Sequence, residues 1–138
     1  MAEGEQVQKS VKEIALWICN AVASESEIEV SSLKSSIHGR EEYSHGLYFL
    51  YNAQKEVVYV GMTHAKKQSL FRRINGNGSG AHKNKNWFSN VCYVKFYPFD
   101  GYSKEQLKLA ERLAIREMEP MYNDETMTIE NVSQFTWS

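Results

Sequence analysis

The stretch from residue 46 to residue 61 constrains the fold more than any other part of the chain. It reads Gly-Leu-Tyr-Phe-Leu-Tyr-Asn-Ala-Gln-Lys-Glu-Val-Val-Tyr-Val-Gly. Two runs rich in β-branched and aromatic residues flank the polar break at residues 52–55, and this pattern predicts a β-hairpin. Tyr48 and Tyr59 fall on its two strands. Because tyrosine is a favoured strand residue, the hairpin alone explains both rings as ordinary sheet aromatics.

Length and composition are those of a soluble globular protein. The 138 residues fit one domain with a hydrophobic core, and the chain is 24% charged and 42% hydrophobic. Cys19 and Cys92 form no metal-type or redox-type pair, so a reducing, intracellular setting is expected. The acidic N-terminus lacks the basic region of a secretory signal, and the apolar run at residues 14–23 is too short to span a bilayer. We therefore expect a cytoplasmic protein (nuclear in a eukaryote) that is neither secreted nor bound to a membrane.

The net charge of -1 hides a basic block. No acidic residue lies between Val57 and Phe99, whereas seven lysines and arginines do, interleaved with aromatic residues such as Trp87. Such a block is typical of a surface that binds the phosphate backbone of nucleic acid, although a solvated loop has the same composition. The predicted substrate contacts are Lys66, Lys67, Arg72, His82, Lys83 and Lys85.

The chain before the hairpin carries no recognisable chemistry. Apolar residues at helical spacing predict a helix over residues 7–23. Residues 24–43 are polar and acidic, and we expect an irregular connection with room for a short strand or a helical turn.

After the hairpin, a short helix is expected to begin near Gln68 or Ser69. The glycine-rich residues 75–80 then favour a loop, which has neither the spacing nor the ending of a Walker phosphate loop. A third strand is predicted over residues 91–97, and Pro98 ends it.

The helix predicted over residues 104–118 places a carboxylate where apolar side chains are expected. Ser103 and Gln106 form a capping box at its start. Glu111 falls within the apolar arc of this helix, and a carboxylate there is costly unless a partner satisfies it. Two interpretations are open: an ion pair with Arg72 or another cation, or a metal ligand or general acid–base group that points into a site.

These segments together resemble the GIY-YIG nuclease superfamily. The two tyrosine motifs appear as Gly46-Leu47-Tyr48 and Tyr59-Val60-Gly61. The helix segment at residues 70–74 places Arg73 at the position of the catalytic arginine of that family. The segment Leu109-Ala110-Glu111 resembles the motif of the metal-binding glutamate, and residues 120–123 resemble its Pro-x-Tyr-Asn ending. The resemblance covers residues 46–123 and rests on the order and spacing of the motifs.

The resemblance implies a fold and a domain plan. The fold class is α/β in the α+β sense: a three-stranded antiparallel sheet flanked by helices, with an extra N-terminal helix. Residues 1–138 then form a single domain, in which residues 1–45 are an N-terminal helical extension and residues 46–123 the nuclease-like core. Residues 124–138 are a C-terminal tail.

The resemblance also implies an activity, a divalent-metal-dependent endonuclease that hydrolyses phosphodiester bonds of duplex or branched DNA. Glu111 would hold Mg²⁺ or Mn²⁺, and Arg73 would bind the scissile phosphate. Tyr59 would activate water with Tyr48 assisting, and Asn123 would orient the hairpin or the water. Repair, restriction, homing and mobile-element nucleases all remain open.

Two features depart from the family. Many members carry a histidine or tyrosine one helical turn after the arginine, where this chain has Asn77, and His82 is the candidate to replace it. Some repair members have a lysine where this chain has Met62.

Two other classes of function stay open. One is a catalytically inactive nucleic-acid-binding module of the same fold. The other is a protein-interaction domain or homodimer that docks through the N-terminal helix or the apolar residues of the tail, such as Phe135 and Trp137. A metal nuclease of another fold, built on His82 and Asn84, lacks a second pair of ligands.

Overall fold

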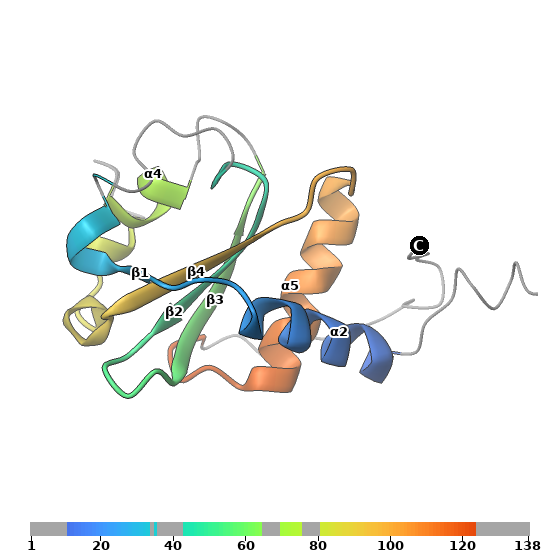
Figure 1. The fold of residues 1–138 in the computed structure, drawn as a ribbon, viewed down its shortest axis with the longest axis horizontal. Helices are drawn as coiled ribbons and strands as arrows, with labels where there is room; N and C mark the ends of the chain where they lie inside the picture. Colours follow the sequence, from blue (N-terminus) through green and yellow to red (C-terminus); the bar gives the residue numbers. More distant parts are fainter. Residues whose placement is uncertain (1–10, 34, 36–42, 65–69, 76–80, 124–138) are drawn as a thin grey trace, which may run out of the picture.

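A computed structural model describes residues 11–33, 35, 43–64, 70–75 and 81–123. These residues form a four-stranded antiparallel sheet with helices packed on both of its faces (Figure 1). The α+β class and the antiparallel sheet are therefore confirmed.

The sheet is built around the predicted hairpin. Strand β2 (Gly46–Tyr51) pairs on one side with β3 (Val57–Thr63) and on the other with β4 (Tyr93–Pro98). A short strand β1 (Ile28–Glu29) adds to the far edge of β4, so that the strand order is β1-β4-β2-β3. The central position of β2 places Tyr48 in the middle of the sheet.

The prediction of three strands was wrong by one. The additional strand β1 has only two residues, paired as Ile28 with Val94 and Glu29 with Tyr93. Such a segment is too short for a period of two to show in the sequence. It is extended because the free edge of β4 supplies hydrogen-bond partners, and the 3₁₀ turn η1 (Val30–Ser32) follows at once.

The turn of the hairpin is held by the side chain of Asn52. Its Oδ1 accepts hydrogen bonds from the backbone N–H groups of Gln54 at 3.0 Å and Glu56 at 2.9 Å. Asparagine commonly closes turns in this way, and Lys55 adopts the left-handed backbone that the turn needs, with φ of 63°.

A β-bulge follows the turn. Leu50 pairs with Tyr59 and Tyr51 with Val57, which leaves Val58 as an extra residue. Bulges re-aim neighbouring side chains, and here Val58 and Tyr59 both contact the same core.

The helices begin and end close to the predicted residues. Helix α5 (Lys104–Met118) has the complete Ser103–Gln106 capping box, and the left-handed Glu119 ends it before Pro120. Helix α2 (Val11–Ala23) confirms the described part of the N-terminal helix, and α4 (Leu70–Asn75) confirms the short one. Within the described residues, no helix combines the length and apolar character needed to cross a membrane.

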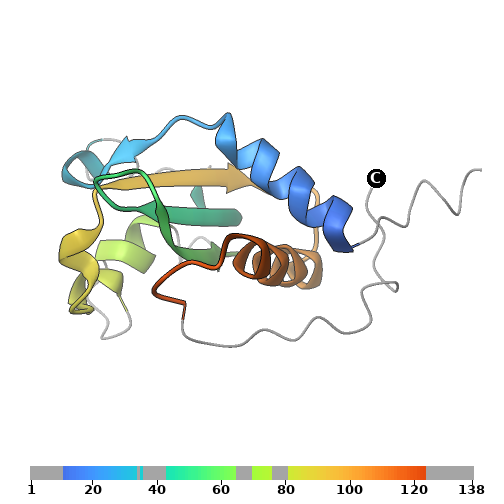
Figure 2. The same cartoon turned by 90° about the horizontal axis from the view of Figure 1, so that it is seen from below.

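One face of the sheet is covered by α2 and α5, which lie next to each other (Figure 2). The apolar side chains of Leu47, Phe49 and Val60 meet both helices in a single cluster, and α5 also runs along the edge strand β3. From the helices this cluster includes Ala15, Ile18, Val22, Leu107, Ala110, Leu113 and Ala114.

The opposite face is covered by short elements. Leu70 and Ile74 of α4 pack with Tyr48, Leu50 and other sheet residues into a second cluster. The 3₁₀ turns η4 (His82–Asn84) and η5 (Phe88–Asn90) lie on this side too. His82, Phe88 and Trp87, which directly precedes η5, contact Tyr48, Tyr59 or the cluster. This second face carries Tyr48 and Tyr59, the tyrosines of the two motifs.

Candidate active site

Tyr48 is the most deeply buried of the predicted catalytic residues. It lies on the central strand with 2% of its surface exposed, directly opposite Gly61 on β3. A Cβ atom at position 61 would overlap the ring and the hydroxyl of Tyr48. The glycine of the second motif is therefore required because the tyrosine of the first motif lies against it.

The hydroxyl of Tyr48 is hydrogen-bonded to His82. Its oxygen lies 2.6 Å from Nε2 of the histidine, which η4 holds in a buried position with 6% exposure. Within the described residues, the other ring nitrogen, Nδ1, is buried with no hydrogen-bond partner. The sequence placed His82 among the substrate contacts and as the candidate to replace a missing histidine, and the structure places it beside Tyr48.

Burial keeps both members of this pair uncharged at neutral pH. Desolvation lowers the pKa of His82 to about 4, and the positive charges of Arg73 and Lys85 act in the same direction. Desolvation also raises the pKa of Tyr48 well above its ordinary value of 10.0. A neutral phenol and a neutral imidazole therefore share the hydrogen bond.

Arg73 and Glu111 both act electrostatically on Tyr48. The arginine lowers the pKa of the phenol and the glutamate raises it, although burial is the larger effect. Both side chains are half-buried, whereas the neighbouring Arg72 is exposed. Helices α4 and α5 thus bring the predicted arginine and glutamate to the same tyrosine, from positions 38 residues apart in the chain (111 − 73).

Tyr59 lies at one end of a column of aromatic rings. Its centroid is 4.7 Å from that of His82 and 5.5 Å from that of Trp87, on which it stacks. Trp87 in turn stacks on Tyr122, at 4.8 Å and an interplanar angle of 12°. Tyr59 is half-buried and is therefore more accessible than Tyr48.

Asn123 is bound to the backbone of the hairpin. Its Oδ1 accepts from the N–H of Val60 at 2.8 Å, and its Nδ2 donates to the carbonyl of Val60 at 3.0 Å. The N–H of Tyr122 donates to the carbonyl of Val58 at 2.7 Å. These bonds cover the edge of β3 on both sides of Tyr59, as edge strands require.

The structure describes four of the six predicted substrate contacts, Arg72, His82, Lys83 and Lys85. Arg72, Lys83 and Lys85 are exposed, and the charge of Lys85 acts on His82. Lys66 and Lys67 lie outside the described residues, as do Asn77 and the tail at 124–138.

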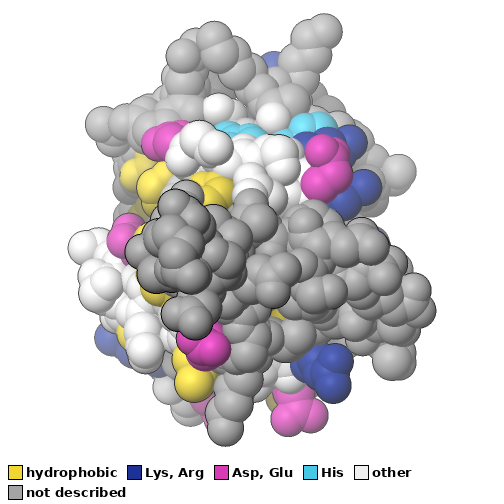
Figure 3. Space-filling model, turned by 90° about the vertical axis from the view of Figure 1, so that its right-hand side faces the viewer, with side chains coloured by type: hydrophobic (Ala, Val, Ile, Leu, Met, Phe, Trp, Pro, Cys, Tyr) yellow, Lys and Arg dark blue, Asp and Glu magenta, His cyan; other side chains and the backbone are white. Residues whose placement is uncertain are grey.

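Two histidines at the open end of the hairpin were not predicted to have a role. His45 precedes β2 and its Nε2 lies 2.9 Å from the carbonyl oxygen of Tyr102, while His64 follows β3. Burial lowers the pKa of His64, followed by the charges of Lys104 and Arg73. Figure 3 shows histidine side chains beside basic and acidic ones on the side of the molecule nearest α5. The sequence signal that could have identified these histidines is their position, since His45 directly precedes the first tyrosine motif and His64 follows shortly after the second.

The metal ligand predicted from the sequence is a single carboxylate, that of Glu111. In the described part of the chain, no three His, Cys, Asp or Glu side chains gather into a metal-binding group. Zinc sites use three or four protein ligands, whereas Mg²⁺ is commonly held by one or two carboxylates together with water and substrate phosphate. Glu111, on the helix beside the edge strand, fits the second pattern.

Comparison with protein-family models, curated proteins and solved structures gave no match. The functional assignment consequently depends on the motifs and on the geometry of this site.

Proposed function

We propose that the protein is a divalent-metal-dependent endonuclease that hydrolyses DNA phosphodiester bonds by a GIY-YIG-type mechanism. The observation that carries the proposal is the buried 2.6 Å hydrogen bond between Tyr48 and His82, at a point where Arg73 and Glu111 both act. A sheet aromatic with a purely structural role needs neither charge nearby.

The proposed roles of the site residues follow from how exposed their side chains are. Arg73 offers its guanidinium fork to the scissile phosphate. Tyr59, which is half-buried, is the tyrosine that can contact a water molecule, and it takes the proton of the attacking water. Tyr48 is enclosed and hydrogen-bonded to His82, so it positions Tyr59 across the hairpin, with the two ring centroids 6.2 Å apart.

Charge explains how a phenol can act as a base. An ordinary tyrosine has a pKa of about 10 and is a poor base at neutral pH. Neighbouring positive charge favours a phenolate, and Arg73, whose charge acts on the adjacent Tyr48, is the residue proposed to supply it. Mg²⁺ or Mn²⁺ held by Glu111 would, when bound, neutralise charge on the phosphate and add to that effect.

The test is metal-dependent nicking of a supercoiled plasmid by the purified protein. We expect Glu111→Ala and Arg73→Ala each to lower the nicking rate at least about 10³-fold, the upper end for loss of one transition-state contact. Circular dichroism checks that both variants remain folded. Nicking at the wild-type rate by either folded variant would contradict the site assignment.

A pair of matched tyrosine variants tests the motif itself. Tyr97 is half-buried on the opposite face of the sheet, where it packs with Trp17. We expect Tyr59→Phe to lose far more nicking activity than Tyr97→Phe. Equal losses would mean that Tyr59 has no special role.

The wild type also distinguishes the two candidate functions. If it binds DNA without metal and does not cleave it, the inactive binding module is favoured instead.

A further inference from the structure

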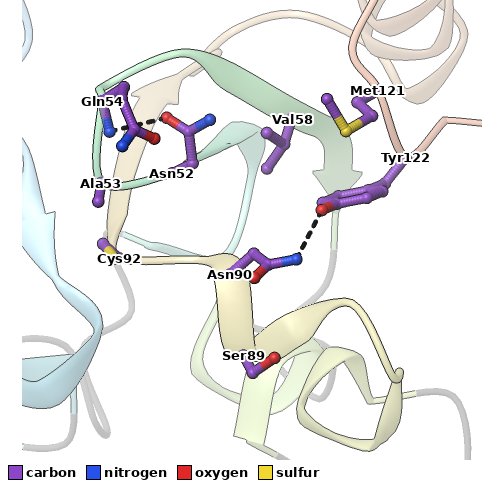
Figure 4. Close-up of a pocket in the computed structure, with 9 residues that line it drawn as sticks. All are labelled: Asn52, Ala53, Gln54, Val58, Ser89, Asn90, Cys92, Met121 and Tyr122. Atoms are coloured by element: carbon purple, nitrogen blue, oxygen red, sulfur yellow. Dashed lines mark hydrogen bonds between the residues drawn. The ribbon is translucent and has the colours of Figure 1, made fainter.

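A cavity of about 340 Å³ lies beside the aromatic column, at the turn end of the hairpin. Its walls come from the hairpin turn, from η5 and from the segment that follows α5 (Figure 4). The volume lies at the lower end of the usual range for small-ligand pockets. None of the predicted catalytic residues lines it.

Polar groups with unused hydrogen-bonding capacity line part of this cavity. The Gln54 carboxamide and the Ser89 hydroxyl make no hydrogen bond with any other described residue. Asn90 uses its Nδ2 to donate to the hydroxyl of Tyr122 at 2.9 Å, a bond that Figure 4 shows at the cavity wall. An occupant with donors and acceptors along one edge would therefore find partners here.

An aromatic ring and apolar side chains form the remaining wall. Tyr122 lines the cavity while stacking on Trp87, and Trp87 stacks on Tyr59. Met121 also lines it and, at 71% exposure, is the more exposed of the two exposed large hydrophobic side chains among the described residues. An aromatic ring and a thioether beside carboxamides suit a planar ring with a polar edge.

We propose that this cavity binds one unpaired nucleobase of a DNA strand, a step that rests on the proposed nuclease function. Stacking on aromatic side chains and hydrogen bonding to an exposed edge are how proteins hold unstacked bases. A base inside a duplex has both faces stacked and cannot enter without leaving the helix. The column Tyr122–Trp87–Tyr59 then links the bound base to the cleavage site, so the preferred substrate has unpaired bases next to the scissile bond.

Cleavage of two substrates tests this inference. One is a blunt duplex and the other is the same duplex with a single-stranded extension. We expect the wild type to cleave the extended substrate about tenfold more efficiently, the effect of roughly one base–aromatic stack. Ser89→Phe fills the cavity from an exposed position and should remove the preference, while Ser31→Phe, an exposed serine that does not line the cavity, should keep it. A preference unchanged in Ser89→Phe would overturn the inference and leave the nuclease assignment standing.

A binding measurement without metal tests base binding by the cavity independently of DNA cleavage. A labelled six-residue oligodeoxyadenylate is titrated without metal, and its fluorescence anisotropy is recorded. We expect Ser89→Phe to weaken binding about tenfold, with Ser31→Phe close to the wild type. This result supports base binding by the cavity even if the protein does not cleave DNA. Absence of cleavage would contradict only the proposed nuclease function. Equal binding by Ser89→Phe and the wild type, or no binding by either, overturns the inference.

Discussion

The two faces of the sheet are made by the same strands but differ in what they bury. The buried core under α2 and α5 is apolar, with Leu47, Phe49 and Val60 meeting two regular helices. The other face buries Tyr48 and His82 beneath short helices and 3₁₀ turns. The apolar face can therefore supply stability while the second face holds polar groups whose burial is costly. The two motif tyrosines lie on the second face and the larger apolar core lies on the first, while α5 carries both core residues and Glu111. The different contributions of the two faces can be tested.

The largest expected effect on stability comes from the apolar face. Leu107 is fully buried there, so Leu107→Ala should lower the free energy of unfolding by about 4 kcal/mol through lost burial and a residual cavity. Urea denaturation measures the change, with the exposed neighbour Lys108→Ala as control. The folded fraction should nick plasmid at the wild-type rate, and a slower rate per folded molecule would show that the two faces are coupled.

The second prediction concerns acid and the site face. His82 has a pKa of about 4 in the folded protein against its ordinary 6.5, so the unfolded chain binds this proton more tightly. Stability should therefore fall as the pH drops from 6.5 to 4, by about 3 kcal/mol from this group, and level off below.

Urea midpoints of the wild type and His82→Gln across this range isolate the contribution of the histidine. The difference between the two proteins should change with pH between 6.5 and 4. A constant difference would show that His82 takes up its proton at the same pH in the folded and the unfolded chain.

A smaller effect is expected at the edge of the hairpin. Asn123→Ala removes two hydrogen bonds to the backbone of Val60 and should cost about 2 kcal/mol, because the bonded groups lose their partners. It should also slow nicking, since β3 carries Tyr59. The exposed Asn86→Ala serves as the matched control, and equal stability of the two variants would contradict a role for Asn123 in holding the strand.

The smallest expected effect is at the start of α5. Ser103→Ala removes the side-chain cap and should lower stability by about 1 kcal/mol, whereas Ser103→Asp should retain it because aspartate caps equally well. Thermal unfolding of both variants distinguishes the two outcomes. A loss with Asp as large as with Ala would mean that the serine acts through another contact.

The sequence was most informative where the signal is local. The hairpin around residues 52–55, the box formed by Ser103 and Gln106, and the apolar arc of α5 all follow from residues within a few positions of one another. Each of these elements was found close to its predicted limits. The grouping of Arg73 and Glu111 around Tyr48 was expected only through the family resemblance.

What escaped prediction depends on contacts between distant residues. The hydrogen bond of Tyr48 is to a histidine 34 positions away, and the stacking of Trp87 on Tyr122 joins residues 35 positions apart (122 − 87). No periodicity encodes such contacts. The bulge at Val58 and the strand β1 are likewise set by their neighbours in the sheet.

The bonds between Asn123 and Val60 also order events during synthesis. They join residues 63 positions apart, so the edge of β3 stays open until the ribosome has passed position 123. The hairpin and β4 are made earlier and can pair first, whereas Tyr122 arrives too late to support Trp87 during that stage. In a nascent chain the strands β2, β3 and β4 can therefore pair before Tyr122 completes the column with Trp87 and Tyr59. For the proposed nuclease, this order delays completion of the active site until nearly the whole described fold has been translated.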